Sequence, residues 1–70
     1  MTESTSVGED FPKQQARVRE ALKVYEEIGP PGAFAAMWIR DLLRRADEAA
    51  ISGDVVQIVR VYEELRDVEL

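Results

Sequence analysis

Two short helix-breaking sequences constrain the fold of this 70-residue chain more than any other feature. The first is residues 29–32 (GPPG), where glycine suits the left-handed residue that ends a helix and proline prevents its continuation. The second is residues 52–54 (SGD), where glycine closes one helix and aspartate caps the next. Around both breaks, apolar residues recur at spacings of three and four, the period of an amphipathic helix. The sequence therefore predicts three helices, at about 12–28, 32–52 and 55–68.

The ends of these helices are predicted from capping residues. Residues 1–9 are polar and acidic and are expected to be a disordered tail that precedes a domain at 10–70. Asp10 is a good N-cap, and Pro12 suits the first turn of a helix. Residues 55–62 are rich in β-branched side chains and leave a strand open as an alternative, although the capping pattern of Asp54 favours a helix. The predicted fold class is all-α, a small three-helix domain.

Composition excludes several kinds of chemistry. The chain contains no Cys and no His, which excludes a disulfide framework, a thiolate zinc site, a cysteine nucleophile and a histidine base. Three short helices do not enclose a deep pocket, so acidic pairs such as Glu63 and Glu64 are interpreted as solvated surface. We therefore expect no catalytic residue, no metal ligand and no cofactor, and a protein that is not an enzyme.

Charge and size bound the partners. Asp and Glu number 14 against 9 Lys and Arg, a net charge of −5, which disfavours nucleic acid and permits a basic partner. No apolar run is long enough for a membrane, and the N-terminus lacks a signal-peptide pattern, so a cytoplasmic location is expected.

Self-association is expected because so small a domain buries only about 60% of its unfolded surface and has no disulfide or metal to stabilise it. The second helix has an apolar stripe wide enough for two neighbours. The predicted homo-oligomer interface on this helix consists of Ala35, Met37, Ile39, Leu42 and Leu43.

A candidate ligand site lies at the start of the second helix. Gly32 would expose backbone N–H groups that favour an anion. Phe34 and Trp38 are four residues apart, so they share a helix face on which a base could stack. Arg40 and Arg44 also share a face and could hold a phosphate. The alternatives are a simple helix connection, aromatic residues in the core, and arginines engaged in surface ion pairs.

Four stretches carry a resemblance: 11–19 (FPKQQARVR), 25–34 (YEEIGPPGAF), 46–54 (ADEAAISGD) and 62–65 (YEEL). Together they resemble a family of short proteins from tailed bacteriophages and prophages, and the Gly-Pro-x-Gly-x-Phe turn is the most specific part. That family has no assigned catalytic residues to carry over. The resemblance implies a counter-defence role by analogy, since small acidic phage proteins often inhibit host systems or sequester nucleotide immune signals.

Two hypotheses of function follow. The first is a phage-type binding protein in the host cytoplasm that sequesters a small nucleotide-like or phosphorylated immune signal at an oligomer seam. The second is an acidic protein-interaction module that inhibits or adapts a host or phage protein. Both are binding functions, and neither needs a catalytic group.

Overall fold

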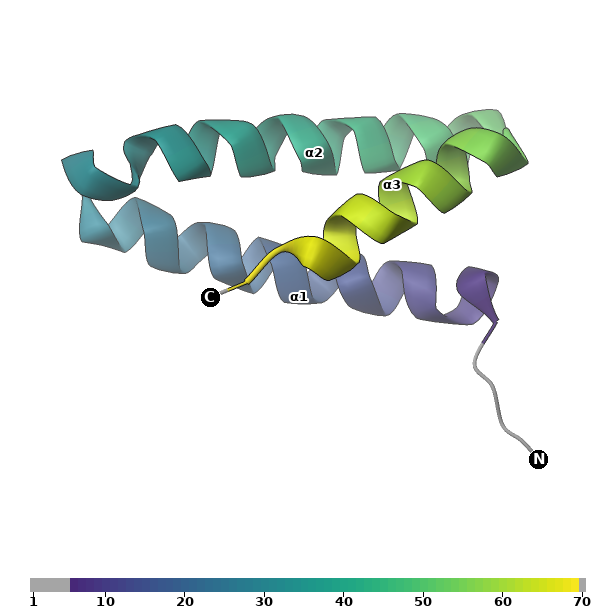
Figure 1. Ribbon diagram of the computed structural model, residues 1–70, viewed down its shortest axis with the longest axis horizontal. Helices are drawn as coiled ribbons and strands as arrows, with labels where there is room; N and C mark the ends of the chain where they lie inside the picture. The colour runs from purple at the N-terminus through teal and green to yellow at the C-terminus, as the bar shows by residue number, and fades with distance from the viewer. Residues whose placement is uncertain (1–5, 70) are drawn as a thin grey trace.

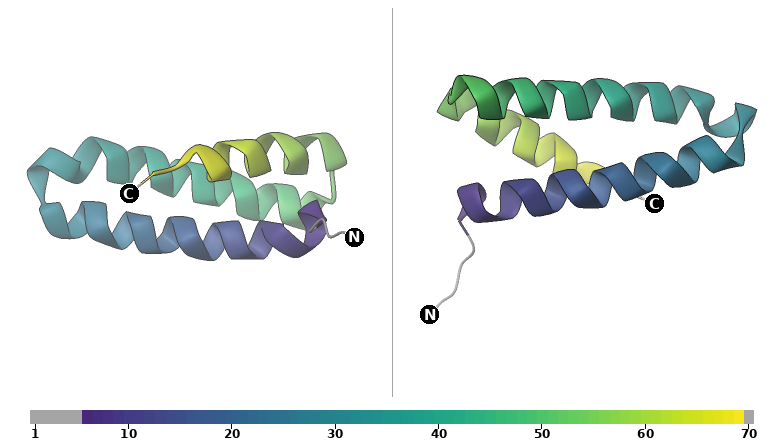
Figure 2. Two further views of the ribbon diagram at one scale, coloured as in Figure 1. Left: turned by 60° about the horizontal axis from the view of Figure 1, so that its bottom comes forward. Right: turned by 180° about the vertical axis from the view of Figure 1, so that it is seen from behind.

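The computed structural model describes residues 6–69, which form three α-helices and one 3₁₀ turn. These are α1 (Val7–Ile28), η1 (Pro30–Gly32), α2 (Ala33–Ser52) and α3 (Val55–Asp67). α1 and α2 form an antiparallel hairpin, and α3 packs across one side of it (Figure 1). α3 starts at the far end of α2 and ends part-way along the hairpin, so the part next to η1 is left without it (Figures 1 and 2). The all-α, three-helix prediction is confirmed, and residues 55–62 are helical.

α1 begins earlier than the sequence analysis predicted. Ser6 is its N-cap: the Ser6 Oγ accepts from the amide of Glu9 at 3.2 Å and donates to the Glu9 carboxylate at 3.2 Å. Ser6 and Glu9 have the spacing of a capping box, but here the Ser6 hydroxyl, in place of its backbone N–H, reaches the Glu9 carboxylate. Asp10 is therefore not the cap, and the prediction of a disordered tail is wrong for residues 7–9, which are helical. Residues 1–5 of the predicted tail lie outside the described residues.

The second break behaves as predicted. Gly53 has a φ of 73°, in the left-handed region, and its amide donates to the carbonyl of Ala49. The Asp54 carboxylate accepts from the amides of Val56 at 3.0 Å and Gln57 at 3.3 Å. These contacts end α2 and start α3 within two residues, which brings α3 back along the hairpin.

The core lies between the three helices. Its largest fully buried side chains are Ile39 and Leu42 of α2, Leu65 of α3 and Val18 of α1. Small side chains allow the helix axes to approach closely, and Ala21, Ala36, Ala46 and Ala49 are buried among the larger ones.

Polar contacts attach α3 to α1 at two levels. The Arg17 guanidinium donates to the carbonyl of Leu65 at 2.7 Å and to that of Val68 at 2.8 Å. Both carbonyls are at the end of α3, where no following turn of helix supplies amide donors. About one turn of α3 earlier, the Tyr62 hydroxyl donates to the Asp10 carboxylate at 2.7 Å. Apolar burial and these hydrogen bonds together fix how far α3 reaches along the hairpin.

The Tyr62 contact predicts a pH effect. The hydrogen bond from Tyr62, and then that from Gln14, lowers the pKa of Asp10 below its ordinary 3.8. A carboxyl whose folded pKa is lowered stabilises the fold above its unfolded pKa, and the contribution is lost as pH falls through the folded pKa. Tyr62→Phe is expected to raise the pKa of Asp10 toward 3.8, as measured by NMR titration of its carboxyl carbon. Tyr25→Phe is the matched control, and an unchanged Asp10 pKa in Tyr62→Phe would contradict the contact.

Candidate functional site

Large apolar side chains are exposed at both ends of the described molecule. One group surrounds the junction of α2 and α3 and consists of Ile51, Val55, Val56 and Val59. The other surrounds the turn between α1 and α2, and we call it the turn-end surface. The turn-end surface consists of Val24, Ile28, Phe34, Met37 and Trp38.

Helix geometry places Val24, Phe34 and Trp38 of the turn-end surface on the side of the hairpin where α3 packs. Residues seven apart lie on nearly the same face of an α-helix. On α2, Trp38 is seven residues before Arg45, which binds α3, and Phe34 is one turn further on. On α1, Val24 is seven residues after Arg17, which also binds α3. These three side chains therefore continue the face that α3 covers, whereas Met37, seven residues before Arg44, lies toward the outer face of α2.

The difference in helix length explains why this part stays uncovered. α2 has 20 residues and α3 has 13. At about 1.5 Å per residue, α3 is about 10 Å shorter than the helix it packs against. Because α3 starts at the opposite end, the uncovered part lies next to η1, as Figure 1 shows.

The aromatic residues predicted for the ligand site are exposed and outside the core. The exposed fraction is 77% for Phe34, 59% for Met37 and 44% for Trp38. The three side chains are neighbours at i, i+3 and i+4 on α2. Exposed apolar side chains that neighbour one another in this way make this end of the molecule a candidate interaction site.

Gly32 does not have the predicted ligand role. Its amide donates to the carbonyl of Gly29 at 2.8 Å, and the Ala33 amide donates to the carbonyl of Pro30. These groups close η1, so they are not free to bind an anion. Gly32 is buried against the backbone of Tyr25, and a Cβ would overlap the Tyr25 carbonyl oxygen. The glycine is required for the close approach of η1 to α1.

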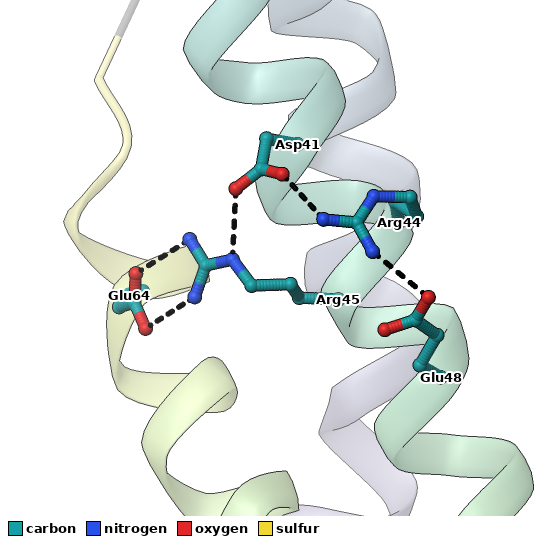
Figure 3. Close-up of polar contacts among 5 residues, drawn as sticks. All are labelled: Asp41, Arg44, Arg45, Glu48 and Glu64. Atoms are coloured by element: carbon teal, nitrogen blue, oxygen red, sulfur yellow. Dashed lines mark hydrogen bonds and ion pairs between the residues drawn. The ribbon is translucent and has the colours of Figure 1, made fainter.

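Arg40 and Arg44 are engaged in ion pairs within the chain. Arg40 pairs with Glu26 at 2.7 Å, across the hairpin. Arg44 bridges Asp41 at 2.6 Å and Glu48 at 2.8 Å along α2 (Figure 3). Their side chains are more than half exposed, so solvent screens these ion pairs and each adds little to stability. The surface-pair alternative describes both arginines, and neither adds net charge beside the aromatic residues.

Arg45 is the basic residue that links α2 to α3. Its guanidinium holds the two carboxylate oxygens of Glu64 at 3.0 Å each, and its Nε donates to Asp41 at 3.0 Å (Figure 3). Hydrogen bonds from Arg44 and then Arg45 lower the pKa of Asp41 below its ordinary 3.8. The i, i+4 spacing of Asp41 and Arg45 predicts their pair, which the structure contains. The pair of Arg45 with Glu64 joins two helices, and no spacing in the sequence indicates it.

The structure places three of the five residues of the predicted oligomer interface in the core of the single chain. Ile39, Leu42 and Leu43 are 1%, 0% and 7% exposed, so their burial is explained without a second copy. The wide stripe on α2 faces two neighbours, as expected, but both are helices of the same chain, α1 and α3. Of the five predicted residues, Ala35 is half-buried and Met37 is exposed.

Two further features bear on the class of site. Within residues 6–69, no three His, Cys, Asp or Glu side chains are placed to hold a metal ion. No helix in the described part of the chain is both long and apolar enough to cross a bilayer.

Comparison with protein-family models, curated protein sequences and solved structures gives no match to this chain. The resemblance to phage proteins therefore stays a prediction that rests on the stretches quoted above.

Proposed function

We propose that this protein is a non-enzymatic protein-binding module and that the turn-end surface is its binding site. The observation that carries the proposal is the grouping of Phe34, Met37 and Trp38 on one face of α2, exposed by 77%, 59% and 44%. Aromatic residues and Met are enriched at protein interfaces, and a few such anchors supply most of the binding energy. The net charge of −5 favours a partner with a basic surface.

The resemblance to phage proteins suggests the setting in which such a module acts. An acidic phage protein of this size would inhibit or adapt a host or phage protein by surface contact. A function without catalysis is supported by the lack of His and Cys and by the exposure of acidic pairs such as Glu26 and Glu27.

Capture from a bacterial lysate tests the proposal. The wild-type protein is expected to retain one stoichiometric partner at low salt, and Phe34→Ser is expected to lose it because an interface anchor is removed. Val56→Ser is the matched control, since it removes an exposed apolar side chain at the other end of the molecule. Ser, Phe and Val have similar helix propensities, so both variants should keep the fold. Equal capture by Phe34→Ser and wild type, or no partner at all, would contradict the proposal.

A second candidate function is the sequestration of a nucleotide-like signal, and the exposure of Phe34 and Trp38 one turn apart supports it. Exposed aromatic side chains stack on bases of any identity. Arg40 and Arg44 would have to exchange a carboxylate for a phosphate, a change that costs little for exposed pairs. Calorimetry with a mixture of ribonucleotides and cyclic dinucleotides should give saturable heat that Trp38→Ser abolishes. Absence of heat with the wild-type protein would reject this candidate.

A further inference from the structure

The turn-end surface continues a site that already holds a helix. α3 packs into the angle between α1 and α2 with Val61, Leu65 and Val68, at spacings of four and three, and these side chains are 2%, 0% and 4% exposed. Beyond Val68, the same face of the hairpin carries exposed apolar side chains, beginning with Trp38 on α2. About 10 Å of uncovered hairpin corresponds to about two turns of helix. Two further turns of a helix could therefore pack on this part of the hairpin in the way that α3 packs on the rest.

The charges around this surface leave a negative excess. The five basic residues between positions 19 and 45 are all in ion pairs: Arg19–Asp47, Lys23–Glu20, Arg40–Glu26, Arg44–Asp41 and Arg45–Glu64. By contrast, Glu27, Asp67 and Glu69 make no ion pair with any residue in 6–69, and Arg66, beside Asp67 in the last turn of α3, makes none either. Three unpaired carboxylates against one guanidinium leave an excess of two negative charges.

These three carboxylates lie beside the surface. Glu27 precedes Ile28 at the end of α1, and the last turn of α1 contains no basic residue. Asp67 ends α3, and the hydroxyl of Tyr25, one turn before Ile28, donates to the backbone carbonyl of Glu69 at 3.0 Å. The C-terminus of α1 adds the negative end of its helix dipole, whereas the Arg17 guanidinium already bonds the last carbonyls of α3. The surface is therefore apolar in its middle and acidic at its rim.

We infer that the turn-end surface binds an amphipathic helix of a partner protein, with apolar anchors spaced by three and four residues and Lys or Arg beside them. The inference rests on the proposed function and names the chemistry of its partner. The docked helix lies beyond the end of α3, on the same face of the hairpin, and its basic residues meet Glu27, Asp67 and Glu69. A second copy of this chain is a poorer match, because it would bring another acidic rim and a net charge of −5.

Trp38 provides a direct reading of this site, because it is the only Trp in the chain. The probe is a 14-residue Leu/Lys peptide without Trp, with Leu at helical spacing, and the matched peptide has Glu in place of Lys. The Leu/Lys peptide is expected to shift the emission of Trp38 to shorter wavelength and to saturate at one peptide per chain. The Leu/Glu peptide is expected to bind at least tenfold more weakly, and added salt should reduce the difference.

Three variants locate the binding. Phe34→Ser should lower the affinity for the Leu/Lys peptide at least tenfold, and Val56→Ser should leave this affinity unchanged. The double variant Glu27→Gln/Glu69→Gln should lower the affinity for the Leu/Lys peptide several-fold. It should also reduce the ratio of this affinity to that for the Leu/Glu peptide. Equal affinity for the two peptides, or unchanged affinity in Phe34→Ser, would overturn the inference. A dimer in sedimentation equilibrium that Phe34→Ser converts to a monomer would also overturn it, since a second copy would then be the occupant.

The failure of the inference and the failure of the proposed function have different signatures. If the Leu/Lys peptide leaves Trp38 emission unchanged while lysate capture still depends on Phe34, the surface binds a protein of other chemistry and only the inference fails. If Phe34→Ser changes neither peptide binding nor capture, the surface is not a binding site and both fail.

Discussion

Gly32→Ala is expected to destabilise the protein by about 3 kcal/mol, the upper part of the usual range for an overpacked site. The cause is a steric overlap of the new Cβ with the backbone carbonyl of Tyr25, which cannot move as a flexible side chain would. Relief of that overlap requires η1 to separate from α1, and this would change how α2 returns along the hairpin. The free energy of unfolding in urea measures the effect.

Gly8→Ala is the matched control for this substitution. Gly8 lies in the first turn of α1, and its nearest neighbour for an added Cβ is the Ser6 Oγ at 3.9 Å, an ordinary contact. Alanine is the better helix former there by about 1 kcal/mol or less, so this variant should be at least as stable as the wild type. If Gly32→Ala unfolds like Gly8→Ala, the close packing of η1 on α1 is contradicted.

Arg17→Ala is expected to cost about 2 kcal/mol, the middle of the range for hydrogen bonds that involve a charged group. The substitution removes the donors to the carbonyls of Leu65 and Val68, which lie 2.7 and 2.8 Å from the guanidinium. Both carbonyls are at the end of α3, and the Leu65 carbonyl otherwise accepts only from the amide of the C-cap residue Val68, at 3.2 Å. In Arg17→Ala, amide hydrogen exchange should speed up relative to the wild type more in α3 than in α2.

Arg60→Ala is the control, because Arg60 is exposed on α3 and makes no side-chain hydrogen bond or ion pair with a residue in 6–69. Such a surface change is expected to alter stability by no more than about 0.5 kcal/mol. Equal stability of the two variants would mean that Arg17 does not hold the end of α3.

The sequence predicted the number, order and approximate length of the helices because the two breaks are local signals. The start of α1 was missed although a local signal was present, since Ser6 and Glu9 have the spacing of a capping box. The better-known preference for Pro near a helix start favoured Pro12 instead, yet Pro12 lies inside α1. Local rules therefore compete, and the backbone hydrogen bonds decide between them.

Contacts between distant residues could not be predicted in the same way. Arg17 contacts carbonyls 48 and 51 residues away, and its spacing along α1 is that of an ordinary surface charge. Gly32 precedes a helix, as the glycine of an anion-binding helix start does. Its close approach to Tyr25 depends on how α1 and α2 pack, which the sequence around it does not indicate. The turn-end surface is uncovered because α3 is short. The sequence did indicate that length, because the apolar residues at helical spacing that follow Gly53 end at Val68.

The central claim of this account is that Phe34, Met37 and Trp38 serve binding and not folding. The measurement that tests it most directly is the urea unfolding free energy of Phe34→Ser beside that of Leu42→Ala. Leu42 is 0% exposed, and its truncation should cost about 2–5 kcal/mol. The account predicts that Phe34→Ser changes stability by no more than about 0.5 kcal/mol. A loss as large as that of Leu42→Ala would show that Phe34 is part of the folded core and would contradict the account.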